Sequence, residues 1–212
     1  MKIRILHLYH DIMNLYGEYG NVRLLTKALE TKGCDVELTK LTITDKAIDF
    51  DSFDFIYCGA GTESNRTFCL SHLKAFSESL KSAFDKNTVM LFTGNAWEMM
   101  GKSITTTEGE TLEGMGLFDF TVSEQNKKRL TGDIKATTDL VNETLIGFIN
   151  KCSSVSGISS PLFTLTMKPE SFESELEGIH EKNFFGTQFV GPVLVKNPAF
   201  CEYMANLITE NK

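Results

Sequence analysis

Two glycine-containing segments are the places in this sequence where chemistry is most readily expected. Residues 58–63 read Cys-Gly-Ala-Gly-Thr-Glu and residues 93–98 read Thr-Gly-Asn-Ala-Trp-Glu, and each follows a short apolar run. Glycine lets backbone N–H groups approach a ligand closely, and a helix that starts after such a turn adds its positive end. Together the segments could bind an anion or stabilise an oxyanion. Alternatively, the glycines only close tight turns between strands and helices, and the residues alone favour neither interpretation.

The elements that must position these segments alternate between strand and helix patterns. Apolar runs predict strands, and spacing of three and four residues predicts helices. In chain order the expected elements are a strand at 3–9, a helix at 22–29, strands at 36–41 and 53–58, a long helix at 66–84 and a strand at 88–92. This order predicts a parallel sheet covered by helices on both faces. Ligands bind beyond the carboxyl ends of such strands, where both segments should lie.

The second half of the chain has a different pattern. It is rich in Thr, Ser, Gly and Phe from about residue 104 to 191, with a turn at 107–110. Strands are expected at 130–136, 145–149, 162–167 and 184–190, followed by a helix at about 199–208. We therefore expect residues 1–212 to form a single domain with a β-rich second half.

Composition excludes several classes of function. A net charge of −7 argues against nucleic-acid binding, and the one short basic cluster, residues 127–129, is typical of a solvated loop. No apolar run is long enough for a membrane helix, and the N-terminus lacks the pattern of a signal peptide. Five cysteines, an odd number without a CxxC pair, argue against a disulfide framework or zinc site. We expect reduced thiols, a cytoplasmic location, and no metal or cofactor.

Four sequence blocks, in order, resemble one enzyme family. Residues 13–21, Met-Asn-Leu-Tyr-Gly-Glu-Tyr-Gly-Asn, are similar to the opening signature of the CobB/CobQ-type class I glutamine amidotransferases, above all the GatD glutaminase subunits of lipid II isoglutaminyl synthase. The other blocks are residues 111–117, 129–134 and 186–198. The resemblance covers nearly the whole chain. It implies a flavodoxin-like, three-layer α/β domain with a mainly parallel central sheet.

The resemblance also implies where the catalytic cysteine and histidine should be. The family's cysteine-containing string matches residues 94–101, so Gly94 takes the nucleophile position, or Thr93 if the register shifts by one. The family's histidine precedes a Gly-Pro pair, and here that position is Val190. Glutamine hydrolysis needs a thiolate and a proton-transferring imidazole. Losing the nucleophile or base of comparable triads costs about 10⁶ in rate, so we expect a pseudoenzyme.

Other residues could retain a binding pocket. The resemblance implies that Arg129 guides glutamine, and a guanidinium suits an α-carboxylate; by spacing alone a surface arginine is the simpler interpretation. Ligand contacts are also expected from the residues of the two turns: Gly59, Ala60, Gly61 and Asn95. The resemblance implies a Mur-ligase-like ATP-dependent partner subunit and, as a small molecule, glutamine.

Two alternatives stay open at the level of sequence. In the first, glutaminase activity persists through a rearranged site with Cys58 as the nucleophile, although a buried cysteine is usually a packing residue. In the second, the chain is a sensor domain that binds a small molecule in a flavodoxin-like pocket.

Overall fold

A six-stranded sheet forms the centre of the molecule. The computed structural model describes residues 1–125, 129–172 and 174–212. The strands lie in the order β13 (Ile179–Glu181), β14 (Phe184–Thr187), β4 (Val89–Thr93), β3 (Phe55–Cys58), β1 (Lys2–Leu8) and β2 (Asp35–Leu41). All neighbours pair in parallel except β13 with β14. The expected, mainly parallel central sheet is confirmed.

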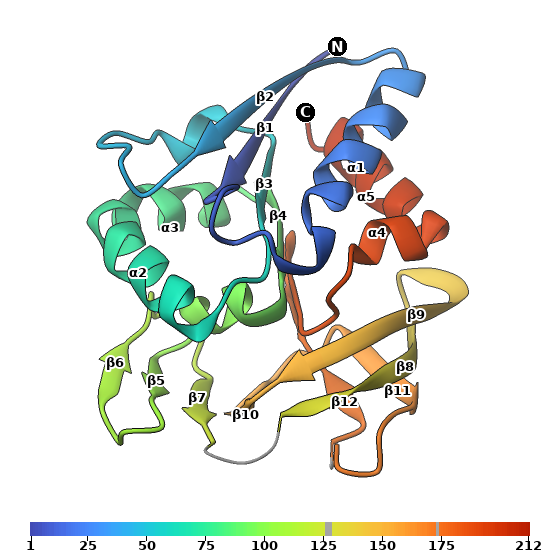
Figure 1. The fold of residues 1–212 in the computed structure, drawn as a ribbon. Coiled ribbons are helices and arrows are strands. Elements are labelled where there is room, and N and C mark those ends of the chain that lie inside the picture. Colours follow the sequence, from blue (N-terminus) through green and yellow to red (C-terminus); the bar gives the residue numbers. More distant parts are fainter. Residues whose placement is uncertain (126–128, 173) are drawn as a thin grey trace.

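Helices cover both faces of this sheet, as expected (Figure 1). One face carries α1 (Tyr19–Thr31), α4 (Val193–Lys196) and α5 (Pro198–Glu210). The other carries α2 (Glu63–Leu73) and α3 (Ser77–Asp85). Helix α1 forms because Val22, Leu25 and Leu29 follow helical spacing, and all three are buried in the core with α5. The result is a three-layer α/β arrangement.

The expected long helix at 66–84 is wrong in one respect. The structure has two α-helices there, joined by the short 3₁₀ helix Lys74–Phe76. The break follows from the backbone at Phe76, whose φ of −120° and ψ of 18° lie outside the helical range. Helix α2 begins before the expected start because the Thr62 side chain accepts a hydrogen bond from the Asn65 N–H at 3.1 Å.

The β-rich second half forms two four-stranded sheets beyond the carboxyl ends of the central strands (Figure 1). The first contains β10 (Ser153–Ser156), β7 (Thr121–Glu124), β5 (Ser103–Thr105) and β6 (Thr111–Glu113). The second contains β12 (Leu176–Glu177), β11 (Phe163–Met167), β8 (Leu130–Thr138) and β9 (Val141–Lys151). The four predicted strands correspond to β8, β9, β11 and β14, and the shorter strands were not predicted.

Two further expectations from the sequence concern the basic cluster and membrane-spanning helices. Of the basic cluster at 127–129, Lys127 and Lys128 lie outside the described residues, and only Arg129 can be placed. Within the described chain, no helix is both long and apolar enough to cross a membrane.

Candidate functional site

The two glycine-containing segments meet at the carboxyl ends of β3 and β4. The second opens the 3₁₀ helix η4 (Gly94–Met100), and its first residue, Gly94, has a φ of +58°. Glycine adopts this left-handed conformation at little cost, whereas residues with a Cβ adopt it rarely. Ala60, Gly61, Gly94 and Val190 line one small pocket. The fold thus brings together residues that are far apart in the sequence.

The environment of Gly94 leaves no room for a side chain. A Cβ at this position would lie 2.5 Å from the Ala60 Cβ and 3.0 Å from Val190 Cγ1. Contacts below 3.0 Å require a neighbour to shift. Val190 itself is 3% exposed and held in place, because its N–H donates to the Phe148 carbonyl at 2.9 Å. The methyl groups of Ala60 and Val190 therefore fill the space that a nucleophilic side chain would need.

Thr93, the alternative nucleophile position, faces away from the pocket. It is fully buried, and its hydroxyl donates to the Glu18 carboxylate and lies 3.0 Å from the Tyr57 hydroxyl. Of these two residues, only Gly94 has the left-handed backbone of a sharp turn. Thr93 has an extended backbone. Neither position offers a thiol, and the carboxylate beside Thr93, that of Glu18, is buried and also accepts hydrogen bonds from Tyr57 and Gly191.

A buried carboxylate, Glu18, ties together the two segments that carry Gly94 and Val190. One of its oxygens accepts hydrogen bonds from Thr93 and, at 2.7 Å, from Tyr57, and the other accepts the Gly191 N–H at 2.8 Å. Glu18 has no exposed surface. Burial raises its pKa, and these hydrogen bonds oppose the rise. Glu18 lies in the sequence block at residues 13–21, but the sequence did not indicate that its carboxylate joins these two segments.

The turn at residues 59–61 is less available to a ligand than expected. The Asn95 side chain accepts the Gly61 N–H at 3.0 Å and donates to the Gly61 carbonyl at 2.9 Å. The Gly61 N–H is therefore already occupied. Gly59 is not among the residues that line the pocket, and a Cβ there would lie 2.6 Å from the Met13 carbonyl oxygen. Of the proposed contacts in the two turns, Ala60, Gly61 and Asn95 reach the pocket.

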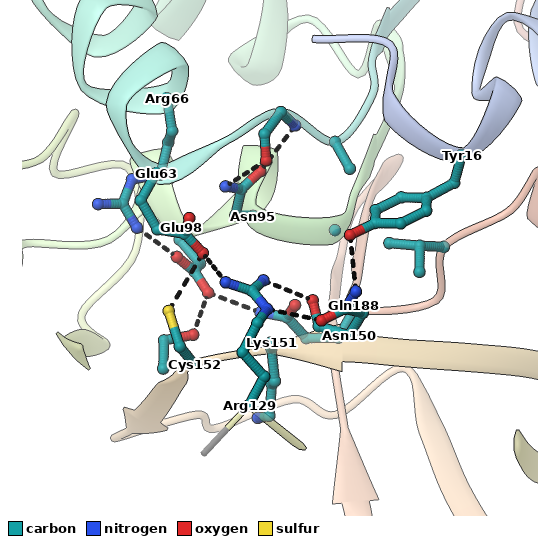
Figure 2. Close-up of a pocket in the computed structure, with 15 residues that line it drawn as sticks. Tyr16, Glu63, Arg66, Asn95, Glu98, Arg129, Asn150, Lys151, Cys152 and Gln188 are labelled. Carbon is teal, nitrogen blue, oxygen red and sulfur yellow. Dashed lines mark hydrogen bonds and ion pairs between the residues drawn. The ribbon is translucent and has the colours of Figure 1, made fainter. Parts of the chain in front are cut away.

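Arg129 lies at the pocket and is held by groups of the chain itself (Figure 2). Its Nη1 is 2.7 Å from a Glu63 carboxylate oxygen, and its Nε and Nη2 donate to the Asn150 side chain and carbonyl at 2.6 and 3.0 Å. Asn150 in turn donates to the Tyr16 hydroxyl at 2.8 Å. Burial tends to raise the pKa of Glu63, but its bonds to Arg129 and Cys152 outweigh this and lower the pKa. Arg129 already has the carboxylate partner that a glutamine would supply.

The pocket is correspondingly small. Its volume is about 10 Å³, which is room for roughly one water molecule. Small-molecule sites usually have volumes of about 300–1,000 Å³, so the pocket as it stands has no room for glutamine.

A second cluster of charges is buried behind the pocket. The Arg66 guanidinium contacts Glu98 at 2.7 Å and also pairs with Glu124. Glu98 additionally accepts hydrogen bonds from Ser153 and, at 2.8 Å, from the side-chain amide of Gln188. Arg66 and Glu98 are each 1% exposed. The sequence did not indicate this role of Glu98, because its partners come from α2, β10 and the segment after β14.

The two cysteines nearest to a possible catalytic role, Cys58 and Cys152, are poor nucleophiles. Cys58 is fully buried on the α2 side of the sheet beside Cys69, and burial raises its pKa well above the ordinary value. Cys152 lines the pocket, but burial and its hydrogen bond to Glu63 raise its pKa to about 11. Since the thiolate is the reactive form, neither is activated at neutral pH. The structure thus argues against Cys58 as a replacement nucleophile, and its described residues form no cluster of three metal-binding side chains.

The fold and the placement of the site define the class of protein. The chain has the fold of the class I glutamine amidotransferases. It superimposes on PurLQS from Thermotoga maritima with a TM-score of 0.62 at 13% identity, covering 100% of this chain and 97% of that one. The glutaminase domain of Trypanosoma brucei CTPS with bound acivicin gives 0.59 at 10% identity, covering 99% and 93%.

Sequence comparison then gives the family. The chain belongs to the CobB/CobQ-like glutamine amidotransferase domain family, which matches residues 4–198. It is 30% identical over 212 residues to the lipid II isoglutaminyl synthase (glutamine-hydrolyzing) subunit GatD of Staphylococcus aureus, covering all of this chain and 86% of the relative. The GatD subunit of Streptococcus pneumoniae is 29% identical, over 92% of this chain and 76% of that one.

Proposed function

We propose that this chain is a GatD-type subunit that does not hydrolyse glutamine. The observation that carries the proposal is the packing around Gly94. The turn keeps its left-handed backbone, but Ala60 and Val190 occupy the space above it, and the described cysteines nearby are buried or protonated. Hydrolysis needs a nucleophile and a base at this point, and the site offers neither.

We further propose that the chain acts as the companion of a Mur-ligase-like ATP-dependent subunit in modification of a cell-wall precursor, in the cytoplasm. The support is that both curated relatives are subunits of a lipid II isoglutaminyl synthase. In such a complex this chain would have a structural or regulatory role, and ammonia would reach the ligase from another source.

Ammonia release from glutamine tests the first proposal. The purified chain, alone and with its partner, is incubated with glutamine beside the Staphylococcus aureus GatD as a positive control. We expect no release above the rate without protein. Turnover that disappears in a Cys58→Ser variant would replace the proposal with a rearranged active site.

Covalent labelling gives an independent check. The glutamine analogue DON alkylates an activated glutaminase cysteine, and peptide mass spectrometry locates the modified residue. We expect no selective labelling of Cys58 or Cys152, because burial raises the pKa of both thiols and keeps them protonated at neutral pH. Selective labelling of Cys58 or Cys152 would contradict a non-hydrolysing role.

A further inference from the structure

A large cavity lies beside the Arg129 pocket, between the two small sheets. Its volume is about 570 Å³, within the usual range for small-molecule sites. The walls come from β10, the end of β9, the start of β12, and the segment around Phe172. The cavity adjoins the Arg129 pocket, and four residues line both: Lys151, Cys152, Ser153 and Gln188. The cavity has the size of a ligand site, which the Arg129 pocket lacks.

One cation in the wall of this cavity has no anionic partner. Among the described parts of the chain, the Lys151 ammonium makes no hydrogen bond or ion pair, and its one close contact is the Phe172 ring, with 4.5 Å from Nζ to the centroid. Burial lowers the pKa of Lys151, while the charges of Glu177 and Glu98 oppose that change. Lys151 is half-buried, and an ammonium removed from water even in part gains from an anion that pairs with it.

The nearby carboxylates are already engaged elsewhere. Glu177 accepts hydrogen bonds from the Thr187 hydroxyl at 2.8 Å and the Gln188 N–H at 2.6 Å. Burial also raises the pKa of Glu177 to about 7, so part of its population is neutral at physiological pH. Glu98 is bound to Arg66, Ser153 and Gln188. Neither carboxylate satisfies Lys151.

The rest of the wall suits the body of an organic molecule. Leu130, Val155 and Leu176 supply apolar surface, and the hydroxyl-bearing residues Ser154 and Ser171 and the amide of Gln125 supply hydrogen-bonding groups. We propose that this cavity binds a small organic carboxylate, with the acid group on Lys151 and the body against the apolar wall. Neither Gly94 nor Val190 lines this cavity, so binding here stands whether or not the chain hydrolyses glutamine.

Calorimetric titration of the full chain with glutarate, citrate and lactate tests the proposal, with the neutral diamide glutaramide as the matched probe without charge. We expect at least one acid to bind and glutaramide not to bind. In Lys151→Met the affinity should fall about tenfold or more, the worth of a charge-assisted contact. Lys135→Met, which removes an exposed lysine on β8, should bind as the unchanged protein does.

A measurement on the unchanged protein avoids any folding defect of the variant. Reductive methylation followed by peptide mass spectrometry should show that the bound acid protects Lys151 and leaves Lys135 as reactive as before. Three results would overturn the proposal: no binding of any of the three acids, binding that persists in Lys151→Met, or binding lost in Arg129→Gln with Lys151 unprotected. The last result would place the acid in the Arg129 pocket instead.

Discussion

At the scale of single residues, Gly94 combines two constraints that one pair of substitutions can separate. Its left-handed backbone disfavours any Cβ, and the Ala60 methyl occupies the space a Cβ would need. We expect Gly94→Ala to lower the free energy of unfolding by about 2–4 kcal/mol, from backbone strain plus overpacking. Urea denaturation measures the change.

The matched control for that substitution is Gly109. It has a φ of +85°, and a Cβ there would meet nothing within 4 Å. Gly109→Ala should therefore cost only the backbone term, about 1 kcal/mol. Adding Ala60→Gly to Gly94→Ala should recover part of the loss. Equal costs at positions 94 and 109 would show that the Ala60 contact is unimportant.

The buried carboxyl group of Glu177 should make the stability of the protein depend on pH. Burial raises its pKa to about 7 in the folded protein from an ordinary value of 4.5. A group with a raised folded pKa contributes stability that is present below pH 4.5 and is lost as pH rises toward 7, here about 3 kcal/mol at most. Glu177→Gln should remove this loss, so the variant gains stability relative to the unchanged protein between pH 4.5 and 7.5.

Urea denaturation at several pH values measures this difference. Glu113→Gln provides the control, because the side chain of Glu113 is 85% exposed and its exchange should leave the pH profile unchanged. A constant stability difference between Glu177→Gln and the unchanged protein across this range would rule out the proposed titration.

At the scale of elements, Arg66 connects α2 to the parts that surround the pocket. Its guanidinium pairs with Glu98 of η4 and Glu124 of β7, in nearly complete burial. Arg66→Met leaves two buried carboxylates without their cation, which should cost about 3–5 kcal/mol of unfolding free energy. Arg23→Met, on the exposed side of α1, should change stability by less than about 0.5 kcal/mol. Similar small effects of both substitutions would show that the cluster is not stabilising.

At the scale of the whole molecule, the proposed companion role predicts a complex. Co-expressed with a Mur-ligase-like subunit, the chain should elute with it in size-exclusion chromatography at a fixed ratio. The complex should amidate its acceptor with ammonium but not with glutamine, because Gly94 and Val190 supply no glutaminase chemistry. Amidation supported by glutamine alone would contradict this.

The sequence by itself determined the layered fold, the family and the absence of a thiol and imidazole at positions 94 and 190. These follow from local spacing of apolar residues and from residue identity, which need no coordinates. It placed the first four central strands well, but it joined α2 and α3 into one helix, because the break at Phe76 is a backbone feature without a Gly or Pro signal.

Only the tertiary structure decided which side chains fill the space beside Gly94 and which charged groups are paired. The Ala60 methyl over Gly94, the Glu63 carboxylate on Arg129 and the unpaired Lys151 each involve residues more than twenty positions apart or a cavity between sheets. Such contacts depend on how elements pack, and sequence periodicity carries no information about them. For that reason the missing thiol and imidazole at positions 94 and 190 were evident from the sequence, whereas the small volume of the pocket and the neighbouring cavity were not.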